Sequence, residues 1–464
     1  MDTKKLRQKI LDLAIRGKLV PQDPNDEPAS VLLERIREEK ERLIKEGKIK
    51  RDKKKEISTS DTSHYRNLPF EVPGSWVWCR LGEIAFLKAG SFVKAEDIKN
   101  ECQSNLFPCY GGNGLRGYVE TFTHEGLFSL IGRQGALCGN INLVRGKFHA
   151  TEHAIVTSLY CNINSMWMFY TLKALNLNQY SIGAAQPGLS VERINKIFIP
   201  LPPFAVQHRI VSVIESAFTF IDQIEESKLS LSQFIKQTKS KVLNLAIRGK
   251  LVPQQNPNDE PTNVLLEKIK NEQKTKKVSA DISHYPFEVP KGWEWGKLGD
   301  VCKQITDGTH RTPSYVEKGI CFLRVTDITE SNSSKKFIST EEHNELIKRC
   351  KPEKGDVLLS KNVTIGVAKV VDWDYDFSIF VSLCLLKPRS IILNSKYLAF
   401  YLRSNEAIKQ MKSRGKSFTI TNLHLEEIKQ LQIIVPPLAE QQRIVSKIEQ
   451  IFVRLEQIEN AMYE

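Results

Sequence analysis

An internal duplication in permuted order constrains this chain more than any other feature. Residues Leu13–Gln22 recur unchanged as Leu245–Gln254, half the chain length later in a chain of 464 residues. A second block, Pro202–Val211, recurs with changes as Pro436–Val445. In the middle of the chain the second block runs directly into the first, whereas at the ends the two are split. The sequence therefore predicts two equivalent units in a circularly permuted repeat with pseudo-twofold symmetry.

Apolar residues repeat at alternating spacings of four and three after the second block, which is the heptad pattern of a coiled coil. An amphipathic helix packed on one globular core is the alternative, but the long run favours a pair of helices. We predict a helix from Phe204 to about Arg248, roughly 65 Å long, which pairs antiparallel with helices at the two chain ends. The expected seam residues are Ile210, Ile214, Ile221, Ile224, Leu231, Ile235, Val242, Ile444, Ile448, Leu455 and Ile458.

Short helices are expected after each copy of the first block. Asp26 and Asp259 precede Pro28 and Pro261, an arrangement typical of a helix N-terminus with the aspartate as its N-cap. Helical patterns follow at residues 31–45 and 264–273. The basic run at residues 48–55 is more typical of a solvated linker than of a DNA contact.

The segments between the helices are rich in glycine, aromatic and β-branched residues, with short alternating strands and a late helix. They predict an α+β fold: two domains, each a curled antiparallel sheet with helices, separated by long antiparallel coiled-coil helices. The expected organisation is scaffold helices at 1–60, a first domain at 61–201, a helical spacer at 202–280, a second domain at 281–435 and a C-terminal scaffold helix at 436–464.

The two domains share a layout but little sequence identity. A strand leads to Arg133-Gln134-Gly135 in the first domain and to Lys361-Asn362-Val363 in the second. A later loop of small residues follows in each, at 183–188 and 415–419. A repeated scaffold with differing domains predicts that the scaffold meets the same partner twice, while the domains read two different things.

The charge balance favours a polyanionic partner. The formal net charge is +13, and each phosphate neutralised by a basic side chain releases condensed counterions. A chain that is basic only for solubility is the alternative. No apolar run approaches the ~20 residues that span a bilayer, so we expect no membrane association. The nine cysteines form no CxxC pair, which favours a reducing cytoplasm over a disulfide framework.

Three motif-like stretches are not expected to carry chemistry. Gly112–Gly117 fits G-x-G-x-x-G, but a strand-like segment follows where a dinucleotide site needs a helix. His149–His153 fits H-x-x-E-H, but its strand-like continuation disfavours the single helical face that zinc chemistry needs. Leu201–Phe204 is similar to a methyltransferase Asn-Pro-Pro-Phe loop without its asparagine. We therefore predict no metal site and no catalytic residue.

Three sequence blocks resemble the specificity (S) subunit of type I restriction-modification enzymes, in the subgroup with an N-terminal scaffold repeat. They are Pro-Pro-x-Ala-x-Gln-x-Arg-Ile-Val at Pro202 and Pro436, Ala-Ile-Arg-Gly-Lys-Leu-Val-Pro at Ala14 and Ala246, and the stretch Asp307–Pro313. The resemblance implies two target recognition domains, each reading one half of a bipartite asymmetric site in double-stranded DNA. It implies that the helices set the unread gap between the half-sites.

The same resemblance implies partner subunits. Two methyltransferase subunits would dock on the scaffold and use S-adenosylmethionine, and two restriction subunits would use ATP and magnesium. These cofactors belong to the partners, so none is expected in this chain. A free-standing two-headed DNA-binding regulator and a zinc hydrolase using His149, Glu152 and His153 remain the alternative hypotheses.

Base reading is expected from loop side chains in the major groove, where Arg pairs with guanine and Asn or Gln with adenine. The candidate DNA-binding residues are Arg133, Gln134 and Gln186 in the first domain and Thr309, His310, Arg311, Lys361 and Lys416 in the second.

Overall fold

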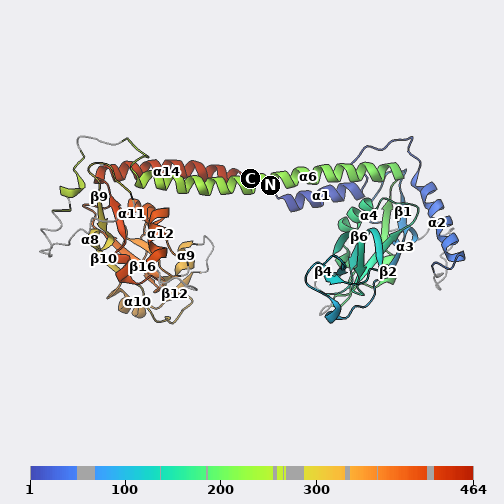
Figure 1. Ribbon diagram of the computed structural model, residues 1–464, viewed down its shortest axis with the longest axis horizontal. Helices are drawn as coiled ribbons and strands as arrows, with labels where there is room; N and C mark the ends of the chain where they lie inside the picture. The colour runs from blue at the N-terminus through green and yellow to red at the C-terminus, as the bar shows by residue number, and fades with distance from the viewer. Residues whose placement is uncertain are drawn as a thin grey trace. The chain divides into compact units, whose positions relative to one another are not determined.

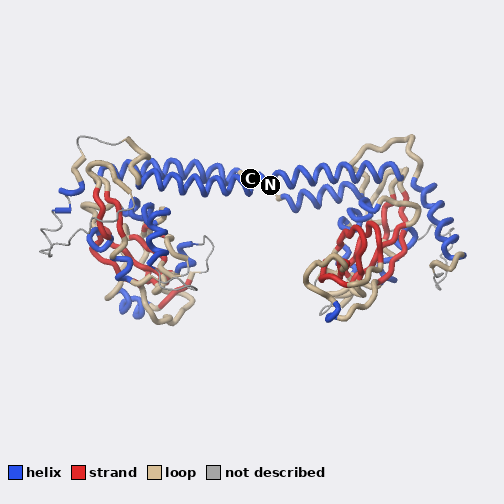
Figure 2. The backbone as a smooth tube through the Cα atoms, viewed as in Figure 1, coloured by secondary structure: helices blue, strands red, loops and turns tan. Residues whose placement is uncertain are grey.

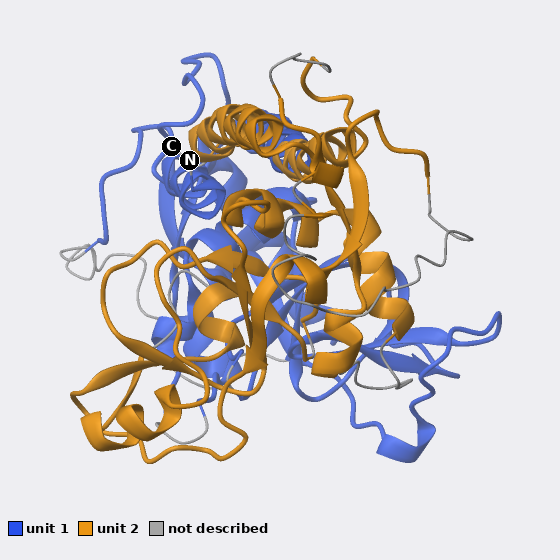
Figure 3. Ribbon diagram, turned by 90° about the vertical axis from the view of Figure 1, so that its left-hand side faces the viewer, with its two compact units in different colours: residues 1–227 blue, residues 228–464 orange. Residues whose placement is uncertain are grey.

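The structure is a computed structural model that describes residues 2–49, 68–135, 137–183, 187–253, 259–264, 266–267, 287–329, 335–362, 364–414 and 423–462. The chain divides into two compact units, Met1–Ser227 and Lys228–Glu464, which Figure 3 colours separately. The boundary falls inside α6 (Phe204–Ile247), one continuous helix of 44 residues, so the predicted long helix is confirmed. Most of the basic linker and of the helix expected at 264–273 lie outside the described residues.

The first unit contains a mixed sheet flanked by helices (Figures 1 and 2). Six strands form one sheet in the order β2-β7-β5-β6-β3-β4, and β1 pairs separately with β8. Neighbouring strands are antiparallel except β3 and β6, which run parallel. The elements before α6 are α1 (Thr3–Ile15), α2 (Ala29–Lys45), β1 (Val77–Arg80), α3 (Leu81–Ile84), β2 (Ala85–Ala89), η2 (Ala95–Asp97), β3 (Phe107–Gly111), β4 (Gly114–Val119), β5 (His124–Gly132), β6 (Ile141–Ala150), β7 (Ala154–Leu159), α4 (Ser165–Ala174), η3 (Leu177–Tyr180), α5 (Val191–Asn195) and β8 (Phe198–Leu201).

The core of this unit lies on both faces of the sheet, because successive residues of a strand point to opposite sides. Leu130 of β5 packs in a small cluster with Phe148 of β6. The next residue, Ile131, belongs to the larger cluster that contains Trp167 and Met168 of α4. Burial on both faces explains why the end of β5 reads as a continuous apolar run rather than an alternating one.

The second unit repeats this plan with two smaller sheets. Four strands form the order β10-β16-β13-β14, three form β12-β11-β15, and β17 pairs with β9. Only β11 and β15 run parallel among these described pairs. Its elements after α6 are β9 (Glu294–Lys297), α8 (Leu298–Val301), β10 (Cys302–Asp307), β11 (Ile320–Leu323), α9 (Val325–Thr329), β12 (Lys336–Ile338), α10 (Thr340–Ile347), β13 (Val357–Ser360), β14 (Ala368–Val370), β15 (Phe377–Ile379), β16 (Leu383–Pro388), α11 (Ser395–Leu402), α12 (Asn405–Arg414), α13 (Leu425–Lys429), β17 (Gln432–Val435) and α14 (Leu438–Ala461).

The predicted α+β class is therefore confirmed, and one detail of it is corrected. Each domain contains one parallel strand pair, β3 with β6 and β11 with β15, where the sequence predicts a wholly antiparallel sheet. In both cases the paired strands are not consecutive in the chain, so a longer connection can return the second strand in the same direction. Short-range strand patterns do not reveal such a return.

Each part of α6 pairs antiparallel with a helix of its own unit (Figure 1). In the first unit Arg7 of α1 binds Asp222 of α6, with 2.6 Å between Nη2 and Oδ1. In the second unit Nζ of Lys239 lies 3.6 Å from Oε1 of Glu456 on α14. The predicted seam residues that are buried are Ile210, Ile214, Ile221, Ile235, Val242, Ile444 and Ile448, and Leu455 is half-buried.

Three predicted seam residues are instead exposed, by 38%, 38% and 46%: Ile224, Leu231 and Ile458. Glu459, close to the end of α14, contacts Lys239 of α6. Leu231 precedes Lys239 by eight residues, or about 12 Å along α6, and therefore lies beyond the end of α14. Arg7, in the second turn of α1, already reaches Glu225 next to Ile224. Ile458 lies between two glutamates that both contact Lys239, so this turn of α14 faces a charge rather than an apolar side chain.

A buried glutamine explains one position of the repeated Pro-Pro block. Oε1 of Gln207 accepts a hydrogen bond from the backbone N–H of Asn164, and its Nε2 donates to the carbonyl of Pro202. Gln441 makes the equivalent bonds to Asn394 and to the carbonyl of Pro436. Both asparagines are N-caps of domain helices, α4 and α11. In each unit the glutamine thus joins the Pro-Pro turn, the scaffold helix and the α+β domain.

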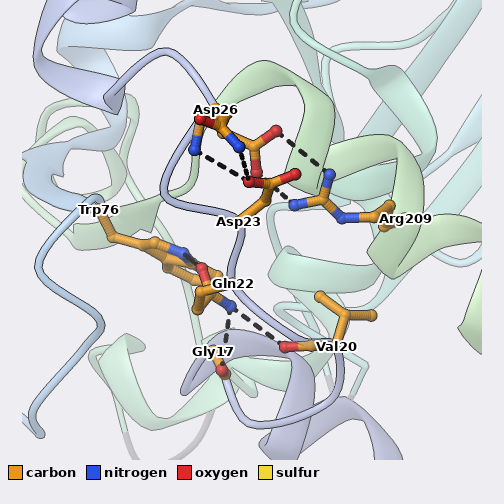
Figure 4. Close-up of polar contacts among 8 residues, drawn as sticks. Gly17, Val20, Gln22, Asp23, Asp26, Trp76 and Arg209 are labelled. Atoms are coloured by element: carbon orange, nitrogen blue, oxygen red, sulfur yellow. Dashed lines mark hydrogen bonds and ion pairs between the residues drawn. The ribbon is translucent and has the colours of Figure 1, made fainter.

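The arginine of the same block binds an aspartate that lies shortly after the other block. Arg209 donates to Asp26, with 3.2 Å between Nη1 and Oδ1 (Figure 4), and Arg443 binds Asp259 over the same distance. The sequence predicts Asp26 as a helix N-cap, and that prediction is wrong, because α2 begins after Pro28 with no side-chain cap hydrogen bond. These ion pairs instead join the Pro-Pro block to the segment that follows the other block within each unit.

Candidate nucleic-acid interface

The loops that follow β5 and β13 hold equivalent backbone positions in the two domains. The N–H of Arg133 donates to the carbonyl of His153 over 2.9 Å, and that of Lys361 donates to the carbonyl of Ser382 over 3.0 Å. In each case the carbonyl of the basic residue accepts from the N–H of a leucine later in the chain. The correspondence inferred from the sequence layout is therefore confirmed in the backbone, while the side chains at these positions differ.

A glycine allows the loop after β2 to lie against the end of β6, and another allows the loop after β10 to lie against the end of β15. A Cβ atom at Gly90 would lie 2.1 Å from the carbonyl oxygen of Ala150, and one at Gly308 would lie 1.9 Å from that of Ile379. Real Cβ atoms do not approach an oxygen so closely, so each position requires glycine. The residue before each glycine differs between the domains: Ala89 ends β2, whereas Asp307 ends β10.

Replacing Gly308 by alanine is expected to displace the loop that carries Thr309, His310 and Arg311. If each domain reads one half of a bipartite DNA site, as the sequence resemblance implies, we expect about a tenfold or larger loss of affinity for one half, because relieving such a clash moves the backbone by a sizeable part of an ångström. Competition binding with duplexes altered in one half at a time measures this effect. Gly296→Ala, whose Cβ would be 3.8 Å from its nearest neighbour, is the matched control. Equal loss in both halves would contradict the prediction.

Two candidate residues of the first domain are placed at the surface. Arg133 is half-buried and Gln134 is exposed. Oε1 of Gln134 lies 3.0 Å from Nδ1 of His153, whose Nε2 lies 3.1 Å from Glu152. This chain of contacts restrains an amide of the kind that pairs with adenine in the major groove. Gln186 lies outside the described residues.

The second domain presents its candidates on a short turn after β10. Oγ1 of Thr309 accepts from the N–H of Arg311 over 3.2 Å, which makes a local turn between the two residues. His310 and Arg311 are exposed, while Thr309 is half-buried. The turn thus projects an imidazole and a guanidinium from a backbone that Gly308 fixes. Lys416 lies outside the described residues.

Asp307 is the centre of a charged cluster in this domain. Its side chain is 4% exposed, and its carboxylate contacts three basic groups. The distances are 2.5 Å to Nη2 of Arg349, 3.2 Å to Nζ of Lys361 and 3.3 Å to Nε2 of His310. The three groups come from the β10 loop, the segment before β13 and the segment after β13, so the carboxylate joins three separate parts of the domain.

Lys361 is buried in this cluster, with only 5% of its side chain exposed. The structure therefore places the ammonium of Lys361 against Asp307 and not at the surface. Arg133, which holds the equivalent backbone position in the first domain, is only half-buried. Burial raises the pKa of the neighbouring Cys350 thiol to about 12, and burial also raises the pKa of the Cys384 thiol well above its ordinary value. Both thiols stay neutral at physiological pH and do not compete with Asp307 for its basic partners.

Arg349 is a residue that sequence reasoning misses. It follows helix α10 in a Lys-Arg-Cys stretch that carries no motif, and its side chain is 56% exposed although one nitrogen is held by Asp307. Asp307, His310, Arg349, Lys361 and Asn362 line an open pocket of about 600 Å³ with Val381 and the first residues of α13. Only the pairing with Asp307, 42 positions away, reveals this role, so no local sequence signal could have found it.

Two of the motif-like stretches, Gly112–Gly117 and His149–His153, take the local structures that the sequence predicts for them. Gly112 and Gly114 lie at the turn between β3 and β4, so a strand and not a helix follows. His149 lies at the end of β6 against Thr121, whereas His153 contacts Gln134, so the two imidazoles do not converge. Within the described ranges, no group of three His, Cys, Asp or Glu side chains could hold a metal ion.

No described helix is long and apolar enough to cross a membrane.

Comparisons with known proteins bear on this arrangement. The family described as "Type I restriction modification DNA specificity domain" matches residues 73–233 and 290–462. The Escherichia coli EcoEI specificity subunit is 26% identical over 99% of this chain and 90% of its own length. The Escherichia coli EcoprrI specificity subunit is 44% identical, over 32% of this chain and 37% of its own length.

A solved structure agrees at the level of the fold. It comes from a study of complex assembly and conformational transition in the type I R-M system, and it covers 85% of this chain and 94% of its own chain. The TM-score is 0.56 and the identity is 19%, so the likeness concerns the fold alone. Two recognition domains on a duplicated scaffold and a family match over most of the chain lead to one assignment: this chain belongs to the family of type I restriction-modification DNA specificity subunits.

Proposed function

We propose that this chain directs a type I restriction-modification complex to a bipartite asymmetric DNA site. Residues 61–201 and 281–435 act as target recognition domains, each reading one half-site. The observation that carries the proposal is that the scaffold contacts are the same in both units, whereas the loop residues of the two domains differ. The scaffold repeats its buried glutamine and its Arg–Asp pair in both units, whereas equivalent loop positions hold Arg133 in one domain and Lys361 in the other.

The repeated scaffold supports docking of the same partner twice. Two methyltransferase subunits would bind it, and two restriction subunits would join through them, in the cytoplasm. S-adenosylmethionine would serve in the methyltransferase subunits, and ATP and magnesium in the restriction subunits. The chain itself would perform no chemistry and would supply position and sequence discrimination only. The names of its relatives, which are specificity subunits of restriction enzymes, support this division of labour.

Recognition would combine two kinds of contact. Lys and Arg side chains on the phosphates would supply affinity without sequence information, consistent with the net charge of +13. Base edges would be read by the loop residues Arg133, Gln134, Gln186, Thr309, Arg311 and Lys416, and His310 would lie beside them on the same turn as Thr309 and Arg311. Because Lys361 is buried against Asp307, we infer that it helps to position the neighbouring side chains and does not contact a base directly.

The decisive experiment is co-expression with type I methyltransferase subunits from the same host, followed by mapping of methylated adenines in host DNA. We expect co-purification and methylation at one bipartite motif, and the chain omitted from the same strain serves as control. Absence of both results would overturn the proposal. Tight specific binding by the isolated chain without any partner would favour the free-standing regulator instead.

Replacing Arg133 by alanine is expected to relax the first half-site. A bidentate arginine–guanine pair is worth about 1–3 kcal/mol of discrimination, so specificity at one base pair should fall roughly 5- to 150-fold. Binding to duplexes carrying each base at that position measures the change. Lys196→Ala removes the same charge from the end of α5, where the side chain is exposed, and is the matched control. A uniform loss over all sequences would instead make Arg133 a phosphate contact.

A further inference from the structure

The pocket around Asp307 offers more than a structural ion cluster. It belongs entirely to the second recognition domain, and its opening carries the exposed parts of two side chains that Asp307 holds. Arg349 is 56% exposed and His310 is 61% exposed. Lys361 completes the cluster from the inside. The floor of this pocket is therefore formed by the buried Asp307 and Lys361, and its exposed rim carries Arg349 and His310.

The guanidinium of Arg349 is the cationic group at this rim and has only donors, while His310, Asn362, His424 and Glu426 line the same pocket. The carboxylate of Asp307 is occupied by three basic partners, and that of Glu426 is held by Lys429 over 2.7 Å. A guanidinium has five N–H donors, and Asp307 takes only one nitrogen of Arg349. A ligand that contacts Arg349 must therefore accept hydrogen bonds, and negative charge on the ligand strengthens its attraction to the guanidinium. A phosphate meets both requirements, because arginine and phosphate form charge-assisted, often bidentate hydrogen bonds.

The position of the rim identifies the source of the phosphate. His310 lies on the turn after β10, next to Thr309 and Arg311, which are candidates for base reading. A phosphate bound beside this turn would set the register of the turn on the duplex, as backbone contacts do in protein–DNA complexes. The first domain has alanine at the position equivalent to Asp307, so it does not share the cluster.

We propose that this pocket binds one backbone phosphate of the DNA, with Arg349 and His310 as the contacting groups. Asp307 and Lys361 are positioning residues that hold them without touching the phosphate. The proposal deepens the DNA-recognition function and rests on it. It assigns to Arg349 a role in affinity for DNA of any sequence, and it confines that role to the second domain.

The test is a salt titration of DNA binding by the full chain, together with its methyltransferase subunits where these co-purify. The probes are a duplex with the mapped site and a duplex of unrelated sequence. For Arg349→Ala we expect the slope of log affinity against log salt to become shallower by about one, with similar losses on both probes. His310→Ala should weaken both probes by a smaller factor. Lys354→Ala, an exposed lysine paired with Asp374 outside the pocket, should leave the slope unchanged.

Asp307→Asn tests the positioning role. Because this substitution removes the partner of a buried lysine, its thermal unfolding is measured first, and the Arg349 variant keeps the test decisive if it does not fold. A folded Asp307→Asn variant should lose affinity on both probes, and adding Arg349→Ala should cause little further loss, since the two residues act through one contact. Independent, additive losses would contradict the positioning role.

Two results would overturn the phosphate site. One is an unchanged salt slope in Arg349→Ala, and the other is loss of discrimination at a single base pair, which would make Arg349 a base contact. Failure of the underlying function is distinguishable, because the unaltered chain would then show no preference for the mapped site over unrelated DNA. That outcome would overturn both the proposed function and this inference.

Discussion

Inserting four residues after Leu231 is expected to lengthen the unread gap between the two half-sites while leaving the half-site sequences unchanged. The helix α6 runs without a break from Phe204 to Ile247, so four residues extend it by about 6 Å and turn it slightly past one full revolution. Leu231 is exposed and lies past the part of α6 that pairs with α14, so the insertion disturbs no buried contact. At 3.4 Å per base pair, the gap should grow by about one or two base pairs.

The effect on the original site should be large. A complex that engages one half-site correctly and misses the other loses several base contacts, each worth about 1–3 kcal/mol, so methylation there should fall at least ~100-fold. Genome-wide mapping of methylated adenines measures the loss at old sites and the gain at new ones. The same four residues inserted after Lys48, beyond the end of α2, are the matched control and should leave the gap unaltered. Changed half-sites with an unchanged gap would contradict the ruler role of the helix.

Replacing Gln207 by leucine is expected to destabilise the first unit by about 2–4 kcal/mol. The substitution leaves the carbonyl of Pro202, which is buried, and the N–H of Asn164, which is part-buried, without the partner that the fully buried Gln207 provides. An unpaired buried donor or acceptor costs more than the net worth of the hydrogen bond itself, because the group has been taken out of water. Protection of backbone amides against hydrogen exchange should fall in β8 and α4 and stay unchanged in the second unit.

Gln441→Leu provides the mirror experiment. It should destabilise the second unit by a similar or larger amount, since Gln441 makes three such hydrogen bonds, including one to the carbonyl of Ile392. Gln223→Leu, an exposed glutamine on α6, is the matched control and should change stability by less than ~0.5 kcal/mol. If both buried variants lowered protection equally in the two units, the glutamine bonds would not be local to each unit.

Local and periodic features are predictable from this sequence because they repeat along the chain. The heptad spacing places the long helix within one residue of its observed ends, and the permuted blocks identify the two units. The layout of the recognition domains predicts that Arg133 and Lys361 hold equivalent backbone positions, which their hydrogen bonds confirm. Each of these inferences depends on which residues are near one another in sequence.

Features that depend on a distant partner are not predictable in this way. Asp26 has the sequence context of an N-cap, but Arg209, 183 positions away, takes up its carboxylate. Leu231 has the spacing of a seam residue, but the helix that would cover it ends too early. Lys361 reads as an exposed basic residue, and only its approach to Asp307 shows it to be buried.

The sequence by itself determined the duplicated plan, the helix and strand types and the family of this protein, since periodicity and repeated blocks are properties of the chain order. The tertiary structure alone decided which charged side chains are partners and which remain open to DNA. A carboxylate such as Asp307 selects its partners by distance in space, and folding brings three basic groups from separate segments to the same oxygens.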